Sequence, residues 1–183
     1  FLVGGTALAL YMGHRKSIDL DLFTLHSFDA PRMRAYLTDR YGLSNAFVRK
    51  DTVKGTIAEI KIDCITYAYP LLERAHEEGG IRLCSLRDIA AMKLSAIADS
   101  GTRLKDFVDV ACLSTRLSLR AYDAKYRGMS PISPLKALTY YDDIREREPI
   151  LTLRGNYDWS LIDYRLQDML AHLEQVYEDF PFT

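Results

Sequence analysis

The residues best suited to chemistry are two aspartates in an otherwise apolar stretch. Asp19 and Asp21 alternate with aliphatic residues, and this period of two predicts a strand with both carboxylates on one face. Their Cα atoms would lie roughly 6.6 Å apart, and like charges that close raise each other's pKa unless a cation compensates them. Because carboxylate oxygens are ligands of hard divalent cations, the pair predicts a site for Mg²⁺ or Mn²⁺.

A third aspartate repeats the pattern later in the chain. In residues 60–65, Lys61 and Asp63 share one face of a predicted strand and apolar residues share the other. If the two strands are neighbours, Asp63 joins Asp19 and Asp21 in a three-carboxylate metal site, which could serve an in-line phosphoryl displacement. The alternative is that the three acids mark the solvent face of a half-covered sheet, because Asp-x-Asp is a common sequence.

A glycine turn precedes the acidic strand. Gly4, Gly5 and Thr6 follow an apolar start and lead into a stretch of helix-forming residues. Glycine lets the backbone approach a ligand closely, and free N–H groups at a helix N-terminus bind phosphate. Thr6 could add a hydroxyl donor. No Gly-Lys-Ser or Gly-Lys-Thr follows, so this is not a Walker P-loop. A Gly-Gly turn alone is more often structural, but combined with three acids it predicts phosphate chemistry.

One lysine lies in the middle of a predicted helix. Lys93 falls within residues 86–98, among alanine, leucine and isoleucine. Its ammonium could neutralise the charge of a triphosphate. Alternatively, its aliphatic stem could cover apolar surface while the ammonium stays in water.

The next predicted helix, over residues 103–117, carries three further candidates. Asp109 lies four residues after Lys105 and three after Asp106, and Lys and Asp four residues apart can form an ion pair within a helix. We favour a functional role for Asp106, and for Lys105 and Asp109 the intrahelical pair is the simpler interpretation.

Arg15 lies just before the acidic strand and could bind a phosphate or pair with Asp19 or Asp21. The histidines are scattered and show no zinc-ligand spacing, which argues against catalysis by them. They are His14, His26, His76 and His172.

The elements that must position these residues alternate between strand and helix in the first half of the chain. A helix capped by Asp29, with Pro31 in its first turn, should end at Gly42. The strands are expected at 1–3, 18–23, 46–48, 56–67 and 81–84, with a hairpin turn at 51–55, and the helices at 6–12, 86–98, 103–117, 135–147 and 161–177. This order predicts an α+β fold, with a mixed sheet and flanking helices in residues 1–84 and a helical part in residues 85–183 that packs on it.

Composition narrows the class of protein. The 183 residues are 48% hydrophobic and 27% charged, with a net charge of −1, which excludes a disordered chain or a disulfide scaffold. Three cysteines without metal-ligand spacing indicate a reduced, cytoplasmic protein. No apolar run reaches the roughly 20 residues of a membrane span. The chain begins at Phe1 rather than Met, so we expect a segment before it.

The near-neutral charge gives no general affinity for nucleic acid. A local basic face for RNA could still form, although such residues usually mark a solvated helix. The residues concerned are Arg116, Arg120, Lys125 and Arg127.

The glycine turn followed by the three acids resembles the nucleotidyltransferase-fold superfamily. The surrounding sequence more closely resembles the AbiEii/AbiGii toxin family of type IV toxin–antitoxin systems. This resemblance is carried by residues 2–10, 13–23, 86–97 and 103–109, and more weakly by residues 137–143 and Trp159.

The resemblance implies a nucleotidyltransferase-like sheet and an Mg²⁺-dependent (or Mn²⁺-dependent) transfer of a nucleotidyl group from an NTP to an acceptor. For some members of the family the acceptor is the 3′ end of tRNA, and a cognate antitoxin is the expected partner. Matched motif by motif, Gly4, Gly5, Thr6 and Lys93 hold the triphosphate, Asp19, Asp21 and Asp63 bind the metal, Asp63 also orients or deprotonates the acceptor hydroxyl, and Asp106 or Asp109 is the later acid.

Two other functions stay open on sequence grounds. One is a non-catalytic nucleotide-binding module that acts through a partner protein. The other is the nucleotidylation of a small molecule or a protein instead of RNA. Binding without turnover would identify the first, and a screen of acceptors would identify the second.

Overall fold

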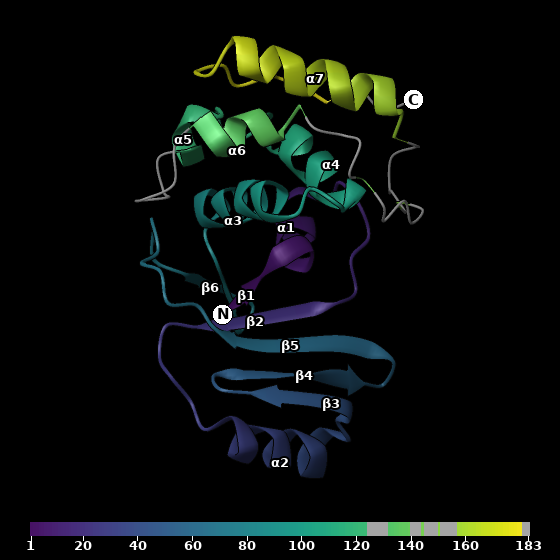
Figure 1. Cartoon of the computed structure of the whole chain (residues 1–183), viewed down its shortest axis with the longest axis vertical. Helices are drawn as coiled ribbons and strands as arrows, with labels where there is room; N and C mark the ends of the chain where they lie inside the picture. The colour runs from purple at the N-terminus through teal and green to yellow at the C-terminus, as the bar shows by residue number, and fades with distance from the viewer. Residues whose placement is uncertain (124–131, 140–143, 145–149, 151–156, 181–183) are drawn as a thin grey trace. The chain divides into compact units, whose positions relative to one another are not determined.

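The computed structural model describes residues 1–123, 132–139, 144, 150 and 157–180 (Figure 1). The chain divides into two compact units. The first unit consists of Phe1–Tyr11 and Ser17–Ser85, and the second of Met12–Lys16 and Leu86–Thr183. The short segment Met12–Lys16 therefore interrupts the first unit in sequence, a feature that the predicted division into 1–84 and 85–183 lacks. Part of the predicted helix 135–147 lies outside the described residues.

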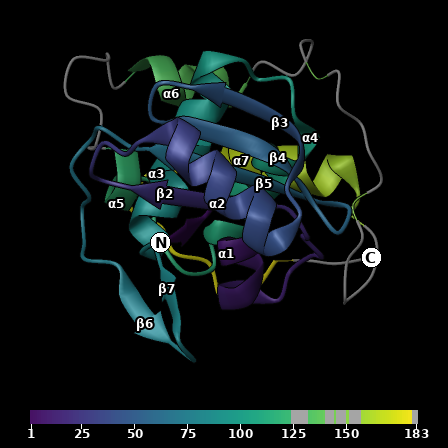
Figure 2. The same ribbon diagram turned by 90° about the horizontal axis from the view of Figure 1, so that it is seen from below.

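A mixed sheet forms the centre of the first unit. Its seven described strands run in the order β3-β4-β5-β2-β1-β7-β6. They are β1 (Leu2–Val3), β2 (Leu20–Thr24), β3 (Ser44–Arg49), β4 (Thr52–Ile57), β5 (Ile60–Thr66), β6 (His76–Glu78) and β7 (Ile81–Leu83). Strand β2 is parallel to β5, and β1 is parallel to β7. The other neighbouring pairs are antiparallel, and Figure 2 shows β6 and β7 as a projecting hairpin.

Helix α2 (Ala30–Tyr41) begins and ends where its caps predict. The Asp29 side chain accepts a hydrogen bond from the main-chain N–H of Arg32, and Gly42 closes the helix in the left-handed conformation, with φ of 71°. The helix lies beside β3 and β4 (Figures 1 and 2). Its residue Ala30 packs in one apolar cluster with Leu43 and Val53. Helix α2 thus covers one face of the sheet at its β3–β4 end.

The strands between residues 44 and 66 differ from the prediction. The expected turn at 51–55 lies mostly inside β4, and the expected strand 56–67 is interrupted by a tight turn at Ala58 and Glu59. Both turn residues have positive φ, 47° and 68°. Because such turns usually carry Gly, Asn or Asp, an Ala-Glu pair has no turn signal in the sequence. The short strand β6 was also not predicted.

Helix α1 (Gly4–Met12) begins two residues earlier than expected. Gly4 and Gly5 therefore form its first turn rather than a separate loop. Ala7 and Leu8 of α1 are completely buried, so apolar packing anchors the helix.

The described part of the second unit is helical beyond its first segment. It contains α3 (Leu86–Asp99), α4 (Leu104–Leu113), α5 (Arg120–Asp123), α6 (Ile132–Ala137) and α7 (Trp159–Ala171). Helix α4 is almost entirely buried, and Phe107 at its centre contacts Trp159 edge-to-face, with ring centroids 6.2 Å apart. Helices α4 and α7 both end earlier than expected, and α7 begins two residues earlier. Among the described residues, no helix has the length and apolar character that a membrane span requires.

The observed architecture is α+β, as predicted. A mixed sheet with two helices comes first in the chain and a helical part follows it.

Candidate active site

A row of charged side chains crosses three strands on the sheet face opposite α2. Strand register pairs Asp21 on β2 with Asp63 on β5, and Asp63 in turn with Lys54 on β4. Paired residues on neighbouring strands point to the same face, and the strands lie about 4.8 Å apart. The expectation that the two acidic strands are neighbours is therefore confirmed, and Asp21 and Asp63 lie side by side.

Gly4 at the start of α1 lies against Asp21, the first of these two acids in the chain. Its φ is +69°, a conformation that L side chains rarely adopt, and a Cβ built on it would overlap the carboxylate of Asp21. Glycine is therefore required here for two independent reasons. The arrangement brings the Asp21 carboxylate to the N-terminal turn of α1, where main-chain N–H groups favour negative charge.

Thr6 connects α1 to the loop before β2. Its hydroxyl donates to the main-chain oxygen of Asp19, and its Oγ1 lies 3.0 Å from the Oγ of Ser17. A hydroxyl has a single proton, so the Thr6 donor predicted for phosphate is used in this structure to hold the backbone at Asp19. The phosphate-binding role of Thr6 stays a prediction.

Lys54 is the site residue that sequence reasoning missed. Its ammonium forms an ion pair with Asp63, and the two side chains are 43% and 26% exposed. The sequence offered no direct signal, because Lys54 fell inside the turn predicted at 51–55. Lys61, which was predicted, is exposed and pairs across the sheet with Thr56 instead.

The carboxylates on this sheet face suit a divalent cation that is bound by two protein ligands. Among the residues that the structure describes, no group of three or more His, Cys, Asp or Glu side chains is arranged to hold a metal ion. Mg²⁺, however, is usually bound through one or two carboxylates, with substrate phosphates and water completing its shell. The Asp21–Asp63 pair beside Gly4 matches that pattern, whereas the full set with Asp19 stays a prediction.

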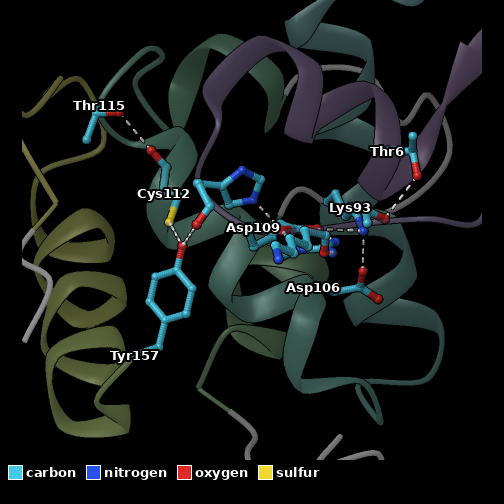
Figure 3. Close-up of polar contacts among 11 residues, drawn as sticks. Thr6, Lys93, Asp106, Asp109, Cys112, Thr115 and Tyr157 are labelled. Carbon is cyan, nitrogen blue, oxygen red and sulfur yellow. Dashed lines mark hydrogen bonds and ion pairs between the residues drawn. The ribbon is translucent and has the colours of Figure 1, made fainter. Parts of the chain in front are cut away.

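A second cluster of charged residues lies within the second unit. Lys93 on α3 donates to Asp106 at 2.5 Å and lies 2.9 Å from Asp109, both on α4 (Figure 3). All three are buried, with relative exposures of 7%, 3% and 0%. The alternative sequence interpretation of Lys93, a surface lysine with its ammonium in water, is therefore wrong, and its role at a triphosphate stays a prediction.

Asp109 is the centre of this cluster. The Arg15 guanidinium donates to it twice, from Nε to Oδ1 at 2.7 Å and from Nη2 to Oδ2 at 2.8 Å. The Nε2 atom of His14 lies 2.8 Å from the same Oδ1. Arg15 thus pairs with Asp109, and the predicted pairing with Asp19 or Asp21 is not what the structure shows.

The charges in the cluster compensate one another. Burial by itself would raise the pKa of Asp109, but the ammonium of Lys93 and the hydrogen bonds from Arg15 hold it well below its usual value. Burial would likewise lower the pKa values of Lys93 and Arg15, and their carboxylate partners raise them instead. Lys93 and Arg15 balance Asp106 and Asp109 in charge. The intrahelical ion pair expected for Asp109 is replaced by these contacts with other segments.

Tyr157 contacts the backbone of the segment that carries His14 and Arg15. Its hydroxyl donates to the main-chain oxygen of His14 at 2.8 Å and lies 3.6 Å from the sulfur of Cys112 (Figure 3). These contacts fix the backbone next to Arg15. Neither Tyr157 nor His14 was predicted, because their partners are more than 90 residues away in the sequence.

The comparisons with known proteins agree with this fold. Residues 1–70 match the family described as nucleotidyl transferase AbiEii toxin, type IV toxin–antitoxin system. The uncharacterized protein aq_aa25 of Aquifex aeolicus (strain VF5) is 33% identical over 156 residues, which cover 80% of this chain and 75% of that protein.

Two solved structures from Helicobacter pylori share the fold. One is JHP933, with a TM-score of 0.57, and the other is a proposed nucleotidyltransferase, with a TM-score of 0.58. Both are 20% identical to this chain and align with 94% of it, covering 82% and 85% of their own lengths.

The fold and the family match define the class of protein as a nucleotidyltransferase. More narrowly, the chain belongs to the AbiEii nucleotidyl transferase toxin family of type IV toxin–antitoxin systems. The family resemblance seen in the sequence is confirmed.

Proposed function

We propose that this chain transfers a nucleotidyl group from an NTP to a hydroxyl of an RNA acceptor, in an Mg²⁺-dependent reaction, as the toxin of a toxin–antitoxin pair. The observation that carries this proposal is the pairing of Asp21 with Asp63, with Gly4 directly against the Asp21 carboxylate. Two carboxylates and a glycine at a helix N-terminus combine metal-binding and phosphate-binding chemistry in one place.

Asp21 and Asp63, joined by Asp19, would hold Mg²⁺ or Mn²⁺. When bound, such an ion neutralises charge on the triphosphate and on the leaving pyrophosphate. The first turn of α1, with Gly4 and Gly5, would offer main-chain N–H groups to the phosphates.

Asp63 would act on the acceptor. Its carboxylate accepts a hydrogen bond from the acceptor hydroxyl and takes its proton as the hydroxyl oxygen attacks the α-phosphorus. The bond between the α-phosphorus and the bridging oxygen breaks, and pyrophosphate leaves with that pair of electrons. The nucleotidyl group is then attached to the acceptor oxygen.

Lys93 and Asp106 are proposed as catalytic residues by family resemblance. An ammonium has three N–H donors, and Asp106 and Asp109 take two of those of Lys93. The third would bind a phosphate oxygen. Arg15 and Asp109 would keep the ammonium in position, and Lys61 and Lys105 are further candidates for contact with substrate.

The acceptor class and the cellular setting are the remaining parts of the proposal. We infer tRNA, through its 3′ end, from the resemblance to the family, together with a cognate antitoxin and a cytoplasmic location. Free thiols at Cys64, Cys84 and Cys112 suit a reducing compartment. In the predicted basic face, Arg120 pairs with Glu174, and Lys125 and Arg127 lie outside the described residues.

The test is transfer of label. The chain is incubated with Mg²⁺, each of the four labelled NTPs in turn, and total RNA, and the products are separated by gel. We expect label on RNA from the wild-type chain and none from Asp19→Asn or Asp21→Asn. Asp39→Asn, which changes an exposed aspartate on α2, should label normally and is the control.

Each other outcome has a definite meaning. Equal labelling by Asp21→Asn would contradict the proposed site. Label on protein or on a small molecule would replace the RNA acceptor with another class. Nucleotide binding without any transfer would favour a non-catalytic module.

A further inference from the structure

Lys54 lies at one end of the row of charged side chains formed by Asp21, Asp63 and Lys54, which we call the acid row. A cation at this position affects both carboxylates. Lys54 is the register partner of Asp63 and forms an ion pair with it, and Asp63 is the register partner of Asp21. The row therefore carries two negative charges and one positive charge on three adjacent strands.

We propose that Lys54 is the resident cation of this acid pair, and that a divalent metal must displace its ammonium from Asp63 in order to bind. This inference rests on the proposed function, because it takes Asp21 and Asp63 as the metal-binding pair. It goes beyond that function by assigning to a residue on β4 the control of metal affinity.

Two physical arguments support displacement. The ammonium uses Oδ2 of Asp63, so a metal that binds this oxygen must compete for it. The strand register places Lys54, Asp63 and Asp21 on three adjacent strands. A divalent cation bound to the two carboxylates would therefore lie close to the positive charge of Lys54 and be repelled by it. The Lys54 side chain is 43% exposed, so its ammonium can move into water without leaving a buried, unpaired charge behind.

The chain supplies a matched control. Lys61 lies on β5, two residues before Asp63, and therefore projects from the same face of the sheet. Its register partner on β4 is Thr56 rather than an acid. Removing Lys61 changes the net charge by the same amount as removing Lys54 but leaves the Lys54–Asp63 ion pair in place.

The experiment measures binding of Mn²⁺ alone, without nucleotide, to the full 183-residue chain. Electron paramagnetic resonance reports the free Mn²⁺ at each point of the titration. We expect Lys54→Met to bind Mn²⁺ about tenfold more tightly than wild type. Lys54→Arg, which keeps the charge, should stay within about twofold, and Lys61→Met within about threefold, because its charge is more distant and solvent-screened. Lys54→Gln repeats the neutral substitution with a polar side chain.

The outcomes separate this inference from the proposed function. If wild type binds Mn²⁺ and Asp21→Asn does not, the metal site stands. In that case an unchanged or weakened affinity in Lys54→Met and Lys54→Gln overturns the role of Lys54 alone. A gain in Lys61→Met as large as in Lys54→Met would also overturn it, because the effect would then be general charge. If Asp21→Asn binds Mn²⁺ as well as wild type, the metal site itself is wrong and the inference falls with it.

Discussion

Arg15 holds the buried carboxylate of Asp109 through two hydrogen bonds of 2.7 and 2.8 Å, one to each carboxylate oxygen, although the two residues are 94 positions apart in the sequence. Such bidentate pairing is specific to the planar guanidinium group and is stronger than a single neutral hydrogen bond. Lys93 shares the same carboxylate. Asp109 is therefore the residue on which the order of the whole buried cluster depends.

Replacing this carboxylate should destabilise the fold strongly. Asp109→Ala leaves Arg15 and Lys93 buried with one carboxylate, Asp106, between them, and removal of one partner from a buried ion pair costs about 3–5 kcal/mol. Urea unfolding followed by circular dichroism measures the free energy. Asp99→Asn, at an exposed position at the end of α3, should change it by less than about 0.5 kcal/mol. A loss below about 1 kcal/mol in Asp109→Ala would show that the cluster contributes little.

The lowered pKa of Asp109 predicts how the free energy of unfolding depends on pH. The pKa of Asp109 is held well below its usual value in the folded chain, against the effect of burial. A group with a lowered folded pKa contributes stability that is complete above its unfolded pKa, about 3.9, and is lost as pH falls toward the folded value. Unfolding free energies measured between pH 6 and pH 2 should therefore fall below about pH 4. The fall should be smaller in Asp109→Asn, and identical slopes would contradict this assignment.

Substitution of Gly4 can distinguish backbone strain at positive φ from displacement of the Asp21 carboxylate. Gly4→Ala forces an alanine to φ of +69° and drives its Cβ into the Asp21 carboxylate. Gly42→Ala imposes a similar φ, +71°, at the end of α2, where a Cβ would meet nothing within 4 Å. Both should lose about 1–2 kcal/mol of stability.

Only the first substitution should affect the reaction. Displacement of Asp21 predicts a more than tenfold loss of label transfer in Gly4→Ala. Transfer by Gly42→Ala should equal that of wild type once both are compared below their unfolding temperatures. Equal activities in the two variants would show that the contact between Gly4 and Asp21 has no part in the reaction.

The cysteines should differ in reactivity between the folded and unfolded chain. Burial raises the pKa of Cys112 to about 12, so its thiol stays protonated at pH 8. Burial also raises the pKa of the half-buried Cys64, helped by the charge of Asp63. A thiol-disulfide reagent at pH 8 should leave Cys84 and Cys112 unmodified in the native chain and titrate all three thiols in guanidinium chloride. Rapid modification of Cys112 in the native state, located by mass spectrometry, would contradict its burial.

Patterns within a few residues correctly predicted the acidic strand and helix α2. The alternation around Asp19 and Asp21 indicated the acidic strand, although β2 begins only at Leu20. The Asp29 cap and Gly42 placed both ends of α2. In each case the signal lies within a few residues of the feature that it predicts.

Features without such signals were missed. The turn at Ala58 and Glu59 carries no glycine, so the hairpins were misplaced and Lys54 was assigned to a turn instead of the acid row. No local pattern links Arg15 to Asp109 either, because that pair is made by tertiary packing. The roles of the acids in metal binding and transfer remain predictions.

The path of the backbone has a practical consequence. Residues 12–16 are grouped with the helices that follow Ser85, yet they are joined on both sides to segments of the sheet-containing unit. A fragment that begins after residue 85 would lack Arg15 and His14. Asp109 would then lose the guanidinium and the imidazole that contact it in the full chain. Each unit is discontinuous in the sequence, so truncation variants of this chain are expected to misfold and would not reveal which unit performs which role.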